Sequence, residues 1–271
     1  MPDQLLTVPQ ELTHTERDRI FDHFQSLPQN EIVFTNHFDI DLEGKPALFV
    51  KYGGDVLAEA STQSFFHALA QDESAPGIPK VYDAFCEEGY CFPVMEKIEL
   101  PTLSTCEISE DDTVQSVASV VKWLLAQAPS VPPSSFGRIS SEEACVWHSF
   151  FKDHWAPLPF ANADALTKYV NKAFSYLPGR PKRSISFSDD LAIYHSDICK
   201  DNFLHDIKTK KTWIVDFQHI GVLPEPFQVY AFFNTDNPFA AAVGDYLGRQ
   251  RFDIANEMTR ACFNRSVGMA A

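Results

Sequence analysis

The chain opens with a helical pattern of apolar residues. Thr13 and Glu16 are spaced to form a capping box, in which each residue satisfies a free backbone N–H of a helix start. The apolar residues that follow share one face of that helix: Ile20, Phe21 and Phe24. The pattern therefore predicts a first helix that packs by this face.

A mixture of short β-like runs and one helical pattern comes next. These segments follow in the order strand, strand, helix, strand, strand: 31–35, 47–50, 55–71, 81–85 and 90–95. Gly44 lies in the turn between the first two runs. This order favours a small sheet with a helix packed on it.

The pattern becomes mainly helical after residue 100. Helices are predicted from Ser109, from about 141 to 155, from 162 to 177 and from 227 onward. Two short apolar runs, 191–194 and 213–215, interrupt the helical part and predict a strand pair. The chain as a whole is thus expected to be α+β, with a sheet-and-helix half followed by a mainly helical half.

Composition limits the class of protein. The chain has 271 residues, of which 45% are hydrophobic and 13% aromatic, as in ordinary globular proteins. This length suffices for one large domain or for two lobes with separate cores. The formal net charge of −15 argues against nucleic acid as a partner, because a nucleic-acid footprint is basic.

The distribution of cysteine and of apolar residues bears on the compartment. The six cysteines are scattered without a CxxC pair, and the first twenty residues carry charges throughout. No apolar run approaches the length of a membrane span. We therefore expect a reduced, soluble, cytoplasmic protein with no membrane partner, whose cysteines have no chemical role.

Acids and amides gather where the two short apolar runs end. The stretch HSDICKDN, residues 195–202, follows the first run, and Asp216 ends the second. Phosphoryl transfer from ATP needs a carboxylate that orients or deprotonates the acceptor hydroxyl, and it needs oxygen ligands for magnesium. Asp197 suits the first role, and Asn202 and Asp216 suit the second if a hairpin brings the two loops together.

These residues also resemble motifs of a known family. HSDICKDN resembles the H-x-D-x4-N catalytic loop of the aminoglycoside phosphotransferase and choline kinase family, which has a protein-kinase-like fold, and residues 215–218 resemble its second metal motif. Residues 49–53 resemble the strand whose Lys holds the phosphates. Residues 57–60 resemble the start of the helix whose Glu pairs with that Lys, and residues 92–96 resemble the hinge. The motifs occur in the order that the family has.

The resemblance implies a fold and an activity. The fold is two-lobed, with a helical extension at 1–27, a sheet-and-helix N-lobe at 28–100 and a helical C-lobe with the catalytic loop at 101–271. The activity is a magnesium-dependent transfer of phosphate from ATP to a hydroxyl of a small molecule, with Asp197 as the catalytic base and ATP and Mg²⁺ as cofactors.

The resemblance also assigns the remaining contacts. Lys51 would hold the α- and β-phosphates, and Glu59 would pair with it. Backbone groups of Glu96 and Ile98 would bind adenine, while Asn202 and Asp216 would bind magnesium. Taken singly, these residues also have ordinary interpretations, since an acid such as Glu59 is favourable in the first turn of any helix.

Two departures from the protein kinases change the expectation. The glycine-rich phosphate loop is missing, and Gln218 stands where the protein kinases have the Gly of their Asp-Phe-Gly motif. No Ala-Pro-Glu segment follows, and 223–226 leads straight towards a helix. A protein substrate uses the missing segment as its platform, so a small-molecule acceptor is favoured.

Two further functions fit parts of the pattern. One is a catalytically inactive kinase-like binding module, suggested by the missing glycine loop. The other is a metal-dependent hydrolase that uses five residues: His195, Asp197, His205, Asp206 and Asp216. It leaves Lys51 and the hinge unexplained. The sequence identifies neither the acceptor nor the oligomeric state.

Overall fold

The chain folds into seven helices and eight strands within the residues that the structure, a computed structural model, describes. These residues are 8–53, 56–132, 135–139, 145–175, 184–234, 237–251 and 258. The helices are α1 (His14–Ser26), α2 (Gln29–Phe34), α3 (Leu57–Leu69), α4 (Glu110–Ala126), α5 (Ala163–Ser175), α6 (Glu225–Phe233) and α7 (Pro238–Tyr246). The strands are β1 (His37–Ile40), β2 (Leu48–Lys51), β3 (Val81–Glu87), β4 (Tyr90–Glu96), β5 (Leu191–His195), β6 (Phe203–Asp206), β7 (Lys211–Ile214) and β8 (Ile220–Pro224).

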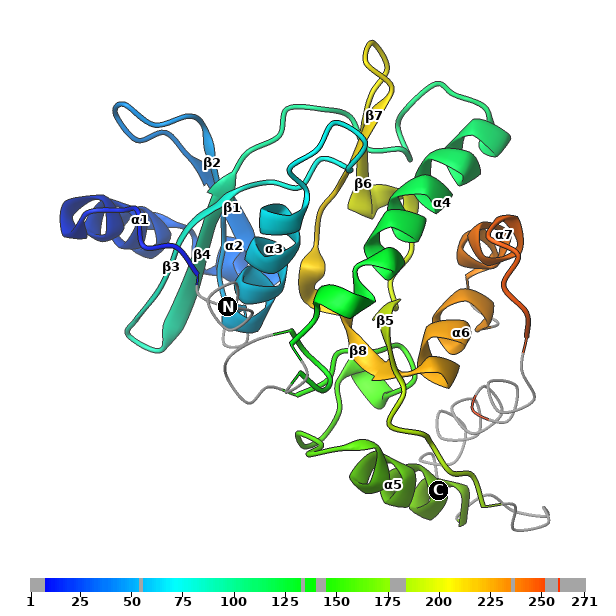
Figure 1. The fold of residues 1–271 in the computed structure, drawn as a ribbon. Coiled ribbons are helices and arrows are strands. Elements are labelled where there is room, and N and C mark those ends of the chain that lie inside the picture. The colour runs from blue at the N-terminus through cyan, green and yellow to red at the C-terminus, as the bar shows by residue number, and fades with distance from the viewer. Residues whose placement is uncertain are drawn as a thin grey trace.

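An antiparallel four-stranded sheet of order β1-β2-β4-β3 forms the first half of the fold (Figure 1). Side chains alternate between the faces of a strand, so Leu48 and Val50 of β2 point one way and Phe49 and Lys51 the other. Leu48 and Val50 join the buried cluster of α1. Helix α3 packs on the opposite face, where Ala60 contacts the sheet.

The predicted capping box of α1 is confirmed. The Thr13 N–H donates to the Glu16 carboxylate at 2.7 Å, and the Glu16 N–H donates to the Thr13 hydroxyl at 3.3 Å. The helix is tied to β3 by Arg17, whose guanidinium lies 2.9 Å from the buried Asp83 carboxylate. Helix α1 is therefore anchored to the sheet by a paired charge and by an apolar face.

The predicted strand at 31–35 is wrong, because residues 29–34 form helix α2. The Ile32 N–H donates to the Pro28 carbonyl at 3.1 Å, which closes the first turn. Val33 and Phe34 are 71% and 85% exposed. Val33 and Phe34 therefore face solvent, while Ile32 packs against the core cluster of α1, and the sheet begins only with β1.

The second half is built around α4 and two small antiparallel sheets. Ser109 caps α4 as predicted, with its hydroxyl accepting from the Asp112 N–H at 3.1 Å. The two strands that the sequence predicts as a pair do not pair with each other: β5 pairs with β8, and β7 pairs with β6. Both small sheets contribute to one buried cluster with α4.

The predicted helix from about 141 to 155 is wrong where the structure describes it. Residues 145–156 form an irregular hairpin, in which the His148 N–H donates to the His154 carbonyl at 2.9 Å. Asp153 and His154 have φ values of 55° and 61°, in the left-handed region that non-glycine residues rarely adopt. These two residues turn the chain back on itself and end any helix there.

The expectation that all cysteines are free thiols is also wrong. Cys86 and Cys91 form a disulfide at the end of the β3–β4 hairpin. Glu88 and Gly89 both have positive φ, which is typical of a tight two-residue hairpin turn, and the strand register places the two cysteines opposite each other. Cys262 lies outside the described residues.

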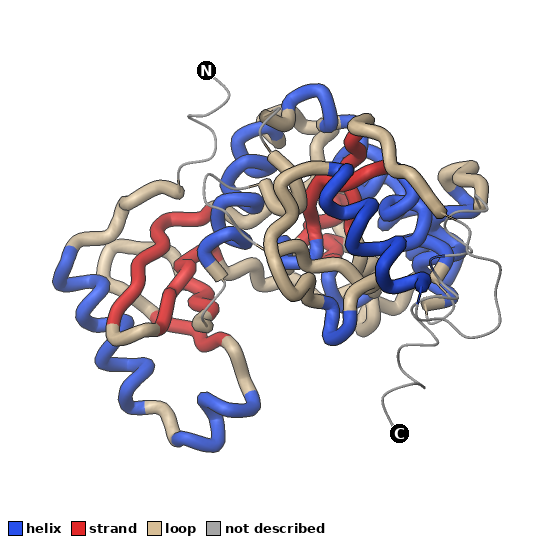
Figure 2. The backbone as a smooth tube through the Cα atoms, turned by 90° about the horizontal axis from the view of Figure 1, so that it is seen from below, coloured by secondary structure: helices blue, strands red, loops and turns tan. Residues whose placement is uncertain are grey.

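Viewed from below, the β1–β4 sheet with α1 lies to one side and the helices that follow α3 lie to the other (Figure 2). Helix α3 is in contact with both parts, with β3 and β4 on one side and the turn at 217–219 on the other. None of the described helices combines the length and apolar character needed to cross a membrane.

A buried histidine predicts how stability depends on pH. His148 accepts from the Phe150 N–H and lies 3.0 Å from the Phe227 carbonyl, to which its other ring nitrogen donates. Burial lowers the pKa of His148 to about 3. Between that value and the unfolded value of about 6.5, the unfolded chain binds one more proton, so the free energy of unfolding falls as pH falls.

We therefore expect His148→Gln to reduce the slope of unfolding free energy against pH between about pH 6 and 4, by up to about 1.4 kcal/mol per pH unit. Urea unfolding at several pH values measures the slope. His14→Gln, at an exposed position, is the control and should keep the wild-type slope. Equal slopes in all three proteins would contradict the assignment.

Candidate active site

Lys51 lies at the centre of a charged cluster formed by three segments. It ends β2 on the face that α3 covers, and its ammonium lies 2.5 Å from the Glu59 carboxylate of α3. The same ammonium lies 3.0 Å from the carboxylate of Asp216, which follows β7. The structure thus brings Lys51, Glu59 and Asp216 together in one ion-pair cluster.

The burial of this cluster determines its electrostatics. The side chains of Lys51 and Glu59 are only 11% and 1% exposed. Burial disfavours the charge on Lys51, but the two carboxylates outweigh it and raise its pKa above the ordinary value. For Glu59 burial is the larger effect and raises its pKa, while Lys51 opposes it. The ammonium is therefore charged at neutral pH.

Asp216 is placed by an unusual backbone conformation. Its φ of 62° lies in the left-handed region, and the chain turns there from β7 into the buried Phe217. Burial alone would raise the pKa of Asp216, but the Lys51 ammonium lowers it below the ordinary value. Asp216 is hence an ionised carboxylate, and its side chain is still 31% exposed.

The loop between β5 and β6 holds Asp197 by hydrogen bonds within the motif. The Asn202 amide nitrogen donates to the backbone carbonyl and to the carboxylate of Asp197, both at 2.9 Å. The Asp197 N–H donates to Nδ1 of His195 at 3.3 Å. Burial lowers the pKa of His195 to about 4, so a neutral ring accepts this bond. His195 thus supports the catalytic loop by accepting a backbone hydrogen bond.

Asn202 and Asp216 are suited to holding a magnesium ion. The Val215 N–H donates to the Asn202 carbonyl at 3.0 Å, so the two residues lie at the same end of the β6–β7 hairpin. Because both hydrogen bonds of the Asn202 side chain use its nitrogen, its oxygen is left as a ligand. An amide oxygen and an ionised carboxylate are hard ligands of the kind that magnesium prefers.

The two predicted hinge residues lie at the end of the interior strand β4 and just after it, outside the Lys51 cluster. Glu96 ends β4, and its N–H donates to the Lys80 carbonyl at 2.8 Å. Its carboxylate accepts from the Lys80 N–H at 3.3 Å. Ile98 follows in an irregular, half-buried segment. Adenine binding by Glu96 and Ile98 therefore stays a prediction.

Two further residues, His219 and Trp147, lie at the site. His219 is buried next to the catalytic loop, where its carbonyl accepts from the Ser196 N–H at 2.9 Å. Burial lowers its pKa, while the carboxylates of Asp197 and Asp216 oppose this. The Trp147 ring packs edge-on against His219 at 5.4 Å. In the sequence, His219 can be associated with the site because it lies three positions after Asp216. Trp147 is far from every motif residue, so the sequence does not point to it.

The residues of the hydrolase interpretation are not assembled. His205 is paired with Thr212 at 3.0 Å, and Asp206 accepts from backbone groups of the turn that follows it. Among the described residues, no group of three or more His, Cys, Asp and Glu side chains is arranged to hold a metal. Lys200 forms an ion pair with Glu110 at 2.6 Å.

Comparison with known proteins supports the resemblance at the level of the fold. No protein-family model and no curated protein matches the sequence. The chain is similar to a crystal structure of a thermostable mutant of aminoglycoside phosphotransferase APH(4)-Ia in ternary complex with AMP-PNP and hygromycin B. The TM-score is 0.53 at 12% identity, over 93% of this chain and 88% of that chain.

A second structure of a thermostable APH(4)-Ia mutant, in complex with ADP and hygromycin B, gives a TM-score of 0.52 at 12% identity. It covers 91% of this chain and 86% of that chain. The chain thus has the α+β fold of the aminoglycoside phosphotransferases, as the order of its motifs predicted.

The unequal burial of the two carboxylates predicts unequal effects on stability. Glu59→Gln leaves a buried ammonium with one partner, and we expect a loss of about 2–4 kcal/mol in the free energy of unfolding. Asp216→Asn removes the more exposed partner and should cost about 1 kcal/mol or less. Urea unfolding measures both. Equal losses would mean that Glu59 is not the principal partner of Lys51.

Proposed function

We propose that the protein is an ATP- and magnesium-dependent phosphotransferase that acts on a hydroxyl of a small molecule. The observation that supports this most is the contact of Lys51 with both Glu59 and Asp216, because it joins three separate motifs in one site. The fold match adds independent support, since the matched structures are complexes of a phosphotransferase with AMP-PNP or ADP.

Each residue has a physical role in this proposal. Lys51 neutralises and positions the α- and β-phosphates, while Glu59 keeps its ammonium in place. Asn202 and Asp216 hold magnesium, which shields the charge of the phosphates when bound. Asp197 orients the acceptor hydroxyl and takes its proton, as the hydroxyl oxygen bonds to the γ-phosphorus and the bond to ADP breaks.

The two-lobed division belongs to the same proposal. Residues 28–100 would form the lobe with the nucleotide contacts, including Glu96 and Ile98, after an extension at 1–27. Residues 101–271 would form the lobe that carries the catalytic loop. A cytoplasmic location is proposed because ATP is supplied there, although the Cys86–Cys91 disulfide is more typical of oxidising compartments.

The alternative is a catalytically inactive kinase-like binding module, and one observation favours it. Helix α2 precedes β1, and the turn between β1 and β2 contains only Gly44, so among residues 8–53 no glycine-rich hairpin covers the phosphates. Ionised Asp216 and the ordered Asp197–Asn202 pair favour the enzyme. Turnover distinguishes the two.

If Asp216 is a magnesium ligand, its substitution should weaken the binding of nucleotide. Asp216→Ala should abolish magnesium-dependent binding of ATP, because it removes the charged ligand. Calorimetry with ATP, with and without magnesium, measures this, and circular dichroism checks that the fold persists. Asp201→Ala, at an exposed position of the same loop region, is the control and should bind ATP as the wild type does. Unchanged affinity in the Asp216 variant would exclude this metal site.

If Asp197 is the base, its substitution should reduce turnover without weakening nucleotide binding. Asp197→Asn keeps the side-chain shape and removes the charge, so ATP should still bind while turnover falls by about 10²–10⁴-fold. A screen of hydroxylated amines, sugars and antibiotics for ADP release supplies the acceptor. If the variant turns over at nearly the wild-type rate, Asp197 is not the base. If ATP binds but no acceptor releases ADP, the inactive module is the better description.

A further inference from the structure

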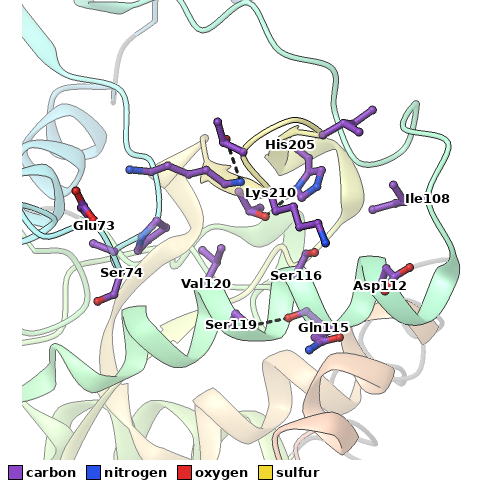
Figure 3. Close-up of a pocket in the computed structure, with 16 residues that line it drawn as sticks. Glu73, Ser74, Ile108, Asp112, Gln115, Ser116, Ser119, Val120, His205 and Lys210 are labelled. Atoms are coloured by element: carbon purple, nitrogen blue, oxygen red, sulfur yellow. Dashed lines mark hydrogen bonds between the residues drawn. The ribbon is translucent and has the colours of Figure 1, made fainter.

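A second site is present apart from the phosphotransfer residues. A pocket of about 680 Å³ lies between α4, the β6–β7 hairpin and residues 73–76 (Figure 3). This volume is within the range of small-molecule sites, about 300–1,000 Å³. None of the five polar residues of the candidate active site lines it: Lys51, Glu59, Asp197, Asn202 and Asp216.

Strand alternation separates this pocket from the other face of the hairpin. His205 of β6 and Thr212 of β7 line the pocket, and both are buried on the side that faces α4. Neighbouring Leu204 and Trp213 point to the opposite face of the same two strands. A ligand in the pocket therefore lies on the α4 side of the hairpin.

The walls of the pocket combine polar and apolar side chains. Figure 3 shows Ser116 and Ser119 on α4 below, with His205 and Lys210 of the hairpin above them. The His205 ring is only 6% exposed and is fixed by the Thr212 hydroxyl at 3.0 Å. The pocket thus has hydroxyl groups on one wall and nitrogen donors on the other.

Lys210, together with Lys211, gives the pocket positive charge. The Lys210 N–H donates to the Asp206 carbonyl at 2.7 Å, and its φ of 59° fixes the direction in which the side chain leaves the turn. Among the described residues, its ammonium has no acidic partner. Neighbouring Lys211, by contrast, lies over the Trp213 ring at 5.8 Å.

The two acids that line the pocket do not neutralise Lys210. The Asp112 carboxylate accepts from the Ser109 hydroxyl at 2.6 Å, as part of the start of α4. Glu73 lies at the opposite edge of the pocket from Lys210 (Figure 3). In a chain of net charge −15, an unpaired ammonium above a row of hydroxyls favours an anionic, hydroxylated ligand.

We propose that this pocket binds a small sugar phosphate, with the phosphate at Lys210 and His205 and the sugar hydroxyls on the α4 wall. An ammonium and an imidazole N–H donate to phosphate oxygens, and charge-assisted hydrogen bonds of this kind are the stronger ones. The Ser119 hydroxyl donates to the Gln115 carbonyl at 2.9 Å and can accept from a ligand, while the Ser116 hydroxyl can both donate and accept, which suits a polyol.

Calorimetry on the full chain tests the proposal, with glucose 6-phosphate as the probe and glucose as its uncharged counterpart. Glucose 6-phosphate should bind the wild-type protein without ATP or magnesium, and glucose should bind at least about tenfold more weakly. Lys210→Gln should weaken the binding of glucose 6-phosphate by about tenfold or more. Ser116→Leu should abolish its binding by filling the pocket.

Two controls separate this site from its surroundings. Lys208→Gln removes an exposed ammonium from the same turn but not from the pocket, and Asp216→Ala removes a proposed magnesium ligand; both should bind glucose 6-phosphate as the wild type does. No binding at millimolar concentration, or equal losses in the Lys208 and Lys210 variants, would overturn the proposal. Loss of binding in Asp216→Ala alone would place the ligand in the phosphotransfer site instead.

Discussion

The buried ammonium of Lys51 is the interaction on which the arrangement of the site depends. A charge that is withdrawn from water is tolerated only where opposite charges compensate it closely. Glu59 supplies one such charge from α3, and Asp216 supplies the other from the end of β7. The sheet, the helix and the β6–β7 hairpin are therefore held in one relative position by a single side chain. Apolar packing supports the same position, because Phe66 of α3 lies 6.0 Å from the Phe217 ring.

Hydrogen bonds connect the segment of Asp216 to the catalytic loop. The Val215 N–H donates to the Asn202 carbonyl, and the Asn202 amide in turn holds the Asp197 carboxylate. Positions that are distant in the sequence are thus connected by two short hydrogen-bond steps. The left-handed backbone of Asp216 is a strained conformation, and it persists because the ion pair and the buried Phe217 fix both sides of it.

The sequence predicted correctly the elements that are determined by interactions between residues close together in the chain. The capping box of Thr13, the Ser109 cap and the β3–β4 hairpin are as expected, because neighbouring residues decide them. The run at 31–35 and the segment from 145 are not, since whether an apolar residue is buried depends on distant partners. The same reason explains why β5 pairs with β8, and why Trp147 next to His219 has no signal in the sequence.

The β6–β7 hairpin is the element that both proposed sites share, and a further segment pairs with its strand β7. Gly77 pairs with it in parallel: the Gly77 N–H donates to the Thr212 carbonyl, and the Ile214 N–H donates to the Gly77 carbonyl. A Cβ on Gly77 would lie 2.0 Å from the Trp213 ring, so this approach requires glycine. Residues 73–76 are therefore next to a segment that is bonded to β7, the strand that leads to Asp216. The wall of the second pocket and the proposed magnesium ligands are thus parts of one hydrogen-bonded unit.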